Sequence, residues 1–174
     1  MKLNAKELRD VDEREISIKL KNIKRRPLYF ILENIYDTYN IGGLFRLADA
    51  LAIEKMYLCG EMEVPPNSRI KKASIGTYKV VPWEYKQSAK EAIDELRKFP
   101  ISIFAVEQHT TSISYQKVDY SLPLALVLGN ETSGVTEETL GLCDQIVEIP
   151  MWGINKSLNV IVSAAIVSYW AVHL

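Results

Sequence analysis

Three polar, glycine-rich segments of this chain have residue types that could hold a ligand and act on it. The clearest is GNETSG at 129–134, which abruptly ends an apolar run at 122–128. An ordinary turn needs about one glycine, whereas two glycines around a carboxylate, an amide and two hydroxyls would let a ligand approach the backbone closely. The other two segments are YDTYNIGGLFR at 36–46 and IPMWGINKSLN at 149–159. Carboxylate, amide and guanidinium groups of this kind suit ligand positioning and charge stabilisation.

Several common chemistries lack their motifs. The chain has no GxxxxGK[ST] phosphate loop, no GxGxxG with a suitably spaced acid and no HExxH zinc motif. His109 and His173 are the two histidines, so a Ser–His–Asp hydrolase would require one of them to lie close to a serine. Cys59 and Cys143 are far apart, without a CxxC pair or a histidine cluster, which argues against a zinc site and a disulfide framework and favours a reducing interior.

The elements that must position these segments alternate along the chain. Apolar runs predict strands, and amphipathic patterns predict helices, one of them with Ser88 as N-cap. The expected strands are 28–35, 55–60, 77–83, 101–107, 122–129 and 145–150; the expected helices are 5–22 (or two short ones), 40–52, 88–99, 136–142 and 157–174. Continuous apolar strands separated by helices predict an α/β fold with a mostly parallel sheet covered on both faces. Ligands in such sheets bind beyond the carboxyl ends of the strands.

Composition indicates an ordinary globular protein. The 174 residues are 48% hydrophobic and 25% charged, which suits one main domain, expected at 27–174 behind a helical and basic extension at 1–26. The longest apolar stretch, 160–174, is too short to span a bilayer, and the N-terminus has no signal-peptide pattern, so we expect a cytoplasmic protein with no membrane role. Because the net charge is −1, nucleic acid would have to bind to local basic patches.

Taken in order, the three segments resemble the motifs of the SpoU (TrmH-like) family of SPOUT RNA methyltransferases. The match covers about residues 27–172. The first motif is Asn40, Gly42, Gly43 and Arg46; the second is Leu128, Gly129, Glu131 and Gly134; the third is Ile149, Pro150, Met151, Gly153, Ser157, Leu158 and Asn159. Trp152 and Tyr39 depart from the usual pattern and bear on access to the pocket.

The resemblance implies a fold with a C-terminal trefoil knot, an exception to the rule against knots. It implies S-adenosylmethionine as cofactor, no metal, and a homodimer formed through the knot region and the C-terminal helix. The implied reaction is methyl transfer to a ribose 2′-hydroxyl of RNA. The chain has few residues before its first strand, which favours transfer RNA over ribosomal RNA.

The resemblance also assigns site residues. The catalytic candidates are Asn40, Arg46, Glu131 and Asn159, and the cofactor candidates are Leu128, Gly129, Asn130, Gly134, Ile149, Met151, Ser157 and Leu158. Arg46 would hold the neighbouring phosphate and stabilise negative charge on the 2′-oxygen. Since the pKa of arginine exceeds about 12, a phosphate oxygen or water is the easier base.

Each assignment has a structural alternative. The two glycines of 42–43 could serve tight packing, Glu131 could position Arg46 or Asn40 or cap the next turn, and Ser157 could be a helix N-cap, although that would not explain Asn159. The four apolar cofactor candidates could be plain core. Arg46 alone could be a surface arginine.

RNA capture needs local positive charge, and two basic runs provide candidates. These RNA-binding candidates are Lys24, Arg25, Arg26, Lys71 and Lys72. The alternative is that they are simply solvated surface. Two rival functions also stay open: a catalytically inactive knotted RNA-binding protein, and a doubly wound nucleotide-binding protein without a role in RNA.

Overall fold

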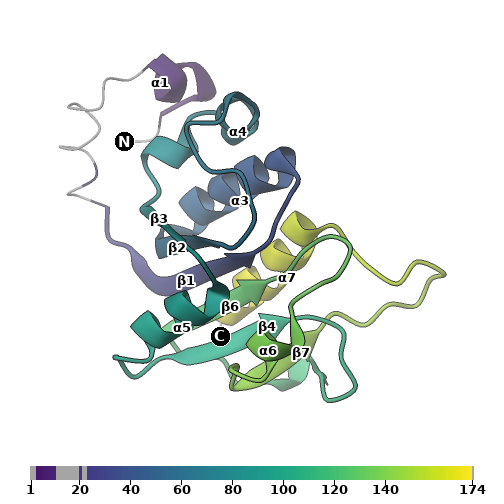
Figure 1. The fold of residues 1–174 in the computed structure, drawn as a ribbon. Coiled ribbons are helices and arrows are strands. Elements are labelled where there is room, and N and C mark those ends of the chain that lie inside the picture. Colours follow the sequence, from purple (N-terminus) through teal and green to yellow (C-terminus); the bar gives the residue numbers. More distant parts are fainter. Residues whose placement is uncertain (1–2, 11–19, 21–22, 174) are drawn as a thin grey trace.

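The computed structural model describes residues 3–10, 20 and 23–173. In this part of the chain seven parallel strands form one sheet in the order β3-β2-β1-β6-β4-β7-β5 (Figure 1). The strands are β1 (Arg26–Glu33), β2 (Ile53–Cys59), β3 (Trp83–Lys86), β4 (Ser102–Val106), β5 (Ile113–Ser114), β6 (Leu124–Leu128) and β7 (Gln145–Glu148). The parallel sheet expected from the sequence is confirmed.

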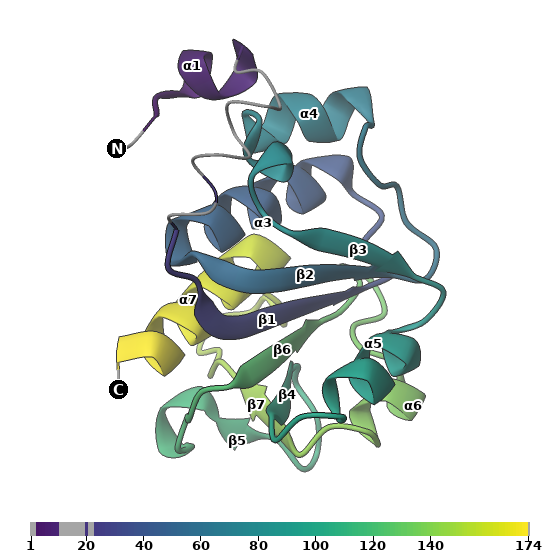
Figure 2. The ribbon, with the colours of Figure 1, turned by 90° about the vertical axis from the view of Figure 1, so that its left-hand side faces the viewer.

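Helices cover both faces of the sheet (Figure 2). One face carries α3 (Thr38–Leu51) and α7 (Val160–His173), with α4 (Ser68–Ser74) packed outside α3. The other carries α5 (Ala89–Leu96) and α6 (Glu137–Leu140). Successive residues of β1 alternate between these layers: Phe30 and Leu32 join the core under α3 and α7, whereas Ile31 joins the core under α5. This double burial explains the continuous apolar runs.

Several expected elements need correction. The expected strand at 77–83 is wrong: Thr77–Lys79 forms the 3₁₀ helix η1 after Gly76, whose φ is +91°, and extended pairing starts at Trp83. α4 lies between β2 and η1, where no helix was expected, and β5 and the 3₁₀ helix η2 (Tyr115–Lys117) were not expected either. At the N-terminus α1 spans Ala5–Asp10, while most of the rest of the expected helix at 5–22 lies outside the described residues.

The glycine pair of α3 serves helix packing. A Cβ at Gly42 would lie 2.4 Å from the Cβ of Ala73 in α4, and a Cβ at Gly43 would lie 2.3 Å from Cδ1 of Ile161 in α7. Each glycine therefore lets a different helix approach α3 closely. The packing alternative for this pair is the one that the geometry supports.

The strand order brings the three motif segments to one edge. β6 lies between β1 and β4, and β7 lies beyond β4, so the loops after all four strands leave the sheet side by side. Among the described residues no helix is both long and apolar enough to cross a membrane.

Candidate active site

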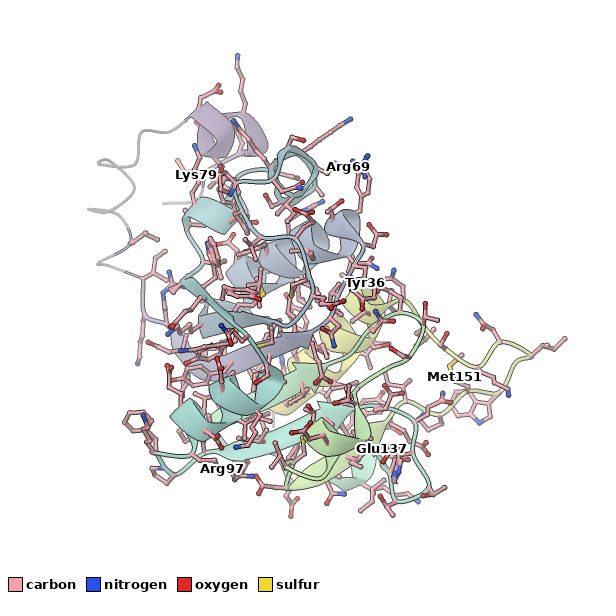
Figure 3. All side chains as sticks on the ribbon, in the orientation of Figure 1. Tyr36, Arg69, Lys79, Arg97, Glu137 and Met151 are labelled. Carbon is pink, nitrogen blue, oxygen red and sulfur yellow. The ribbon has the colours of Figure 1, made fainter. Side chains whose placement is uncertain are left out.

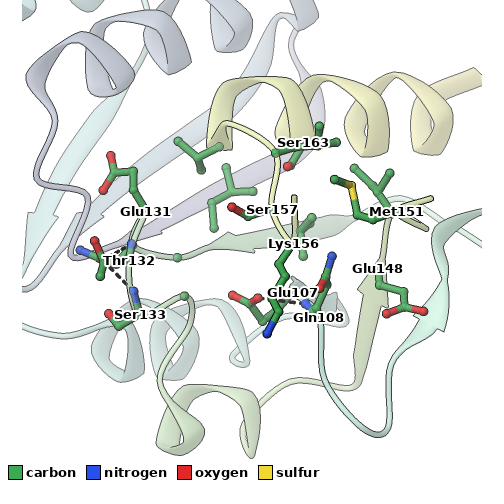
Figure 4. A pocket seen from close by; sticks show the side chains of 18 residues that line it. Glu107, Gln108, Glu131, Thr132, Ser133, Glu148, Met151, Lys156, Ser157 and Ser163 are labelled. Carbon is green, nitrogen blue, oxygen red and sulfur yellow. Dashed lines mark hydrogen bonds between the residues drawn. The ribbon is translucent and has the colours of Figure 1, made fainter. Parts of the chain in front are cut away.

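A cavity of about 390 Å³ opens beyond the carboxyl ends of β4, β6 and β7 (Figure 4). All eight cofactor candidates line it: Leu128, Gly129, Asn130, Gly134, Ile149, Met151, Ser157 and Leu158. Residues more than 20 positions apart in sequence thus form one wall because parallel strands end at a common edge. Within the described residues, no three His, Cys, Asp or Glu side chains are grouped so that they could hold a metal ion.

The loop after β6 folds back on itself. Asn130 and Gly134 exchange two backbone hydrogen bonds of 3.1 and 2.9 Å. The Asn130 side chain accepts from the N–H groups of Thr132 and Ser133 and donates to the carbonyl of Asn34, 2.7 Å away at the end of β1. Asn130 therefore organises the loop that forms one side of the cavity and fastens it to the neighbouring strand.

The two glycines of this loop are required by the loop itself. A Cβ at Gly129 would lie 2.2 Å from the nitrogen of Val135, and a Cβ at Gly134 would lie 2.2 Å from Oε2 of Glu107. Gly134 also has a φ of +70°, which favours glycine. We expected these glycines to admit a ligand to the backbone; the fold needs them in any case, and they leave bare backbone facing the cavity.

A chain of hydrogen bonds links the three motif segments. Asn40 Nδ2 donates to Glu131 Oε1 (2.8 Å), and Asn159 Nδ2 donates to Asn40 Oδ1 (3.0 Å). Asn159 Oδ1 in turn accepts from the N–H of Ile161 (2.9 Å), so Asn159, and not Ser157, caps α7. The alternatives for Glu131 were to position Arg46 or Asn40 or to cap the next turn. In the structure its carboxylate binds Asn40.

Arg46 stands apart from this network. It is exposed, it does not line the cavity, and it makes no hydrogen bond or ion pair with the described residues. It follows Gly42 and Gly43 by about one turn, and these contact α4 and α7 respectively, so Arg46 lies between the two helices that flank α3. Its guanidinium is available to a ligand that approaches from outside.

The basic candidates divide into two kinds. Arg25 is half-buried and donates to the carbonyls of Ile53 (3.1 Å) and Val80 (2.7 Å), contacts that hold η1 against the sheet. Lys24, Arg26, Lys71 and Lys72 are exposed. In the view of Figure 3, Arg69 of α4 lies at the surface on the same side as Tyr36 and Met151.

Glu33 and Glu107 are carboxylates of this region that were not among the sequence candidates, as is Glu148 in the cavity wall. Glu33, buried at the end of β1, accepts from the N–H and hydroxyl of Thr136 and from the hydroxyl of Thr139, and so fixes the start of α6. Glu107, directly after β4, lines the cavity. Both follow or end apolar strands, and this was the signal that could have identified them.

The sequence of this chain is similar to those of known RNA methyltransferases. Residues 27–169 match the model of the SpoU rRNA Methylase family. The tRNA (guanosine(18)-2′-O)-methyltransferase of Escherichia coli K12 is 29% identical over 152 residues, which are 85% of this chain and 64% of the relative. The 23S rRNA (guanosine-2′-O-)-methyltransferase RlmB of Neisseria meningitidis is 32% identical over 85% of this chain and 59% of the relative. The chain thus spans less than two thirds of the length of these relatives.

Solved structures give the same answer. The SpoU methyltransferase AviRb of Streptomyces viridochromogenes, in complex with AdoMet, matches with a TM-score of 0.78 and 28% identity over 87% of this chain and 62% of that chain. The A. aeolicus TrmH/SpoU tRNA modifying enzyme matches with a TM-score of 0.77 and 26% identity over 90% of this chain and 82% of that chain. This fold implies the C-terminal trefoil knot. By the match of most of its length, the chain belongs to the SpoU rRNA methylase family.

Proposed function

We propose that this chain is an S-adenosylmethionine-dependent RNA methyltransferase that transfers a methyl group to a ribose 2′-hydroxyl. The observation that carries the proposal is the hydrogen-bonded chain Asn159–Asn40–Glu131, which joins all three motif segments beside one cavity. The named activities of the relatives, on tRNA and on 23S rRNA, support the same reaction.

The cavity suits the proposed cofactor. Its volume of about 390 Å³ lies in the usual range for small-molecule sites. Apolar side chains such as Leu128, Ile149 and Leu158 can enclose a base, and the backbone at the two glycines can read its edge. Glu107, Glu131 and Glu148 also line the cavity, with Lys156 as the one Lys or Arg among its lining residues, so its charge favours a cationic ligand. When bound, the cofactor supplies a methyl group on a sulfonium.

The chain's own residues then have distinct tasks. Glu131 and Asn159 keep Asn40 in one orientation at the start of α3. The exposed guanidinium of Arg46 binds the phosphate next to the target ribose and stabilises negative charge on its 2′-oxygen. Because arginine keeps its proton, a phosphate oxygen or water receives the proton of the hydroxyl.

The RNA is proposed to be transfer RNA, as for the relatives from E. coli and Thermus thermophilus. Residues 27–174 would form the catalytic domain, and 1–26 an extension that helps to capture RNA. The exposed cations Lys24, Arg26, Lys71 and Lys72 would contact phosphates. Arg25 is proposed to support this surface through its carbonyl contacts.

We also propose a homodimer that works in the cytoplasm. Apolar side chains are exposed on the segment before α7 and on α7 itself: Trp152, Ile154, Leu158, Val162 and Tyr169. A second copy of the chain would cover them.

Methylation of RNA in vitro tests the proposed reaction. Purified protein is incubated with methyl-labelled S-adenosylmethionine and either total tRNA or rRNA, and the digested nucleosides are analysed by mass spectrometry. We expect a single 2′-O-methylated nucleoside, formed in the tRNA. Label found on a base would contradict the ribose assignment, and absence of transfer to either RNA would favour the inactive RNA-binding alternative.

A further inference from the structure

Glu107 carries no role in the reaction described so far, although its carboxylate lies in the cavity. It directly follows Val106, which pairs with Leu128, so Glu107 leaves the sheet beside Gly129. In Figure 4 it lies among side chains from two sides of the cavity, with Ser133 on one and Gln108 on the other.

Two backbone donors hold this carboxylate in place. Oε2 accepts from the N–H of Val135 (3.0 Å), and Oε1 accepts from the N–H of Gln108 (2.9 Å). Gly134 leaves the space that Oε2 occupies, since a Cβ there would come within 2.2 Å. Neither oxygen has a cationic partner among the described residues.

The remaining acceptor sites of the Glu107 carboxylate suit a ligand that donates two hydrogen bonds. An ionised carboxylate has about four acceptor sites, and Glu107 uses two of them. A vicinal diol, such as the 2′- and 3′-hydroxyls of a ribose, has two O–H donors close enough together for one carboxylate. Glu131 and Glu148 each already hold a side-chain partner, Asn40 and the hydroxyl of Ser112 respectively, whereas Glu107 accepts from backbone N–H groups alone among the described residues.

We propose that Glu107 binds the ribose hydroxyls of the methyl donor and so selects an adenosine ligand with an intact diol. The inference rests on the proposed function, in which the base lies against the glycine backbone. The ribose is bonded directly to the base, so a side chain beside that backbone meets the ribose before the amino-acid tail. Glu107 is thus a binding residue that determines which donor is accepted.

Isothermal titration calorimetry on the whole chain tests this inference without any turnover. The probes are S-adenosylhomocysteine, its 2′-deoxy and 3′-deoxy analogues, and 5′-methylthioadenosine, which has the ribose but no amino acid. We expect the wild type to bind each deoxy analogue roughly ten- to hundredfold more weakly than S-adenosylhomocysteine, as for the loss of a hydrogen bond to a charged group. In Glu107→Gln this preference should fall to a few-fold or less, and binding of 5′-methylthioadenosine should weaken as well.

Glu148→Gln is the matched control, since it neutralises a second carboxylate of the same cavity, and it should keep the preference for the diol. Glu107→Asp, which keeps the charge at a shorter reach, should retain part of it. The inference is overturned if the wild type does not discriminate against the deoxy analogues, or if Glu107→Gln discriminates as the wild type does. It is also overturned if Glu107→Gln binds S-adenosylhomocysteine more weakly but 5′-methylthioadenosine equally well, because Glu107 would then hold the ammonium group. Failure of the wild type to bind S-adenosylhomocysteine at all would overturn the proposed cofactor with it.

Discussion

At the scale of single residues, side-chain amides hold the motif segments of the candidate site together. Asn159 uses its oxygen to cap α7 and its nitrogen to hold Asn40, so the position of a helix end and the orientation of an active-site side chain depend on one residue. An aspartate could cap the helix but could not donate to Asn40, and a serine would not reach both partners. This double use explains why an asparagine is present at a position where several residue types could cap a helix.

Arg46→Ala should reduce methylation while leaving cofactor binding unchanged. The guanidinium is exposed and outside the cavity, so its removal disturbs neither the cavity wall nor the hydrogen bonds of Asn40. We expect turnover to fall roughly 10²-fold or more, the loss typical of one electrostatic stabiliser. Single-turnover kinetics with saturating tRNA would measure the loss, and calorimetry with S-adenosylhomocysteine would check binding. Turnover near that of the wild type would remove Arg46 from the mechanism.

Gly134→Ala should destabilise the fold and weaken cofactor binding together. The new Cβ would need a φ of +70° and would collide with Glu107 Oε2, so we expect a loss of roughly 1–3 kcal/mol in the free energy of unfolding. Urea denaturation would measure it. Gly141→Ala is the control, because a Cβ there lies an ordinary 3.5 Å from the carbonyl oxygens of Glu137 and Glu138 and should change stability by less than about 1 kcal/mol. Equal effects of the two substitutions would contradict this account.

The residues of the site could be predicted from the sequence, but the structural roles of several of them could not. The motif pattern identified Gly134 and Asn159 without indicating that one makes room for Glu107 and the other caps α7. Glu107 is 27 residues from Gly134, and their contact exists because β4 and β6 are neighbours in the sheet. Such contacts depend on strand order, which local patterns do not contain.

At the scale of elements, long buried strands and amphipathic helices were predictable because their periodicity is set by burial. α5 begins after Ser88, whose hydroxyl accepts from the N–H of Glu91 as its sequence suggested. The segment 77–83 was wrongly expected to be a strand because its valines, Val80 and Val81, are buried directly after the 3₁₀ helix η1 and not in extended backbone. α4 was missed because a seven-residue helix with three cations has little apolar periodicity.

An ion pair joins three elements on the α5 side of the sheet. Arg97, just after α5, donates to both oxygens of Asp144 (2.7 and 3.0 Å), which also accepts from the N–H of Ile103 in β4. Partial burial acts to raise the pKa of Asp144, but Arg97 and the N–H of Ile103 lower it, and the pKa lies below its usual value. The contact therefore stabilises the folded chain above the unfolded pKa of about 3.9 and loses this effect as the pH falls below that value.

Asp144→Asn should consequently lower stability at pH 7 by up to about 1 kcal/mol, since both partners are more than a third exposed. At pH 3 the variant and the wild type should differ less, because this carboxyl, with a pKa of about 3.9 in the unfolded chain, is largely protonated there once the wild type unfolds. Urea midpoints at the two pH values give the comparison. Asp94→Asn, which removes only the exposed pair with Lys90, should change stability less at pH 7. A difference that grows towards pH 3 would have the wrong sign for this explanation.

α4 gives the proposed RNA surface a testable charge. Lys71 and Lys72 are exposed on this helix, which packs on α3 next to Arg46. If each contacts a phosphate, the double change Lys71→Gln and Lys72→Gln should reduce the salt dependence of tRNA binding, with the slope of log K against log salt smaller by about 1.5. Fluorescence titrations at several salt concentrations measure the slope. Lys90→Gln, on the opposite face, should leave it unchanged, and an unaltered slope in the double variant would assign α4 to ordinary solvated surface.

At the scale of the whole molecule, the helices that cover the two faces of the sheet present different side chains to solvent. The face under α5 presents charged side chains such as Lys90 and Asp94, whereas α7 presents an apolar stripe of Val162, Ile166 and Tyr169 at helical spacing. The segment before α7 adds Trp152, which is 92% exposed. A large apolar surface of this kind next to the cavity is typical of a protein interface.

Val162→Glu should therefore separate the proposed homodimer. A carboxylate at Val162, at the start of the α7 stripe, would be buried without a partner in the dimer but fully solvated in the monomer, so association should weaken without a change in the monomer fold. Light scattering after size-exclusion chromatography should give the dimer mass for the wild type and the monomer mass for the variant at micromolar concentration. Phe99→Glu places the same charge on another exposed apolar residue, just after α5 on the opposite face, and should remain dimeric. A wild type with the monomer mass, or a Val162→Glu variant that stays dimeric, would show that α7 does not hold two copies together.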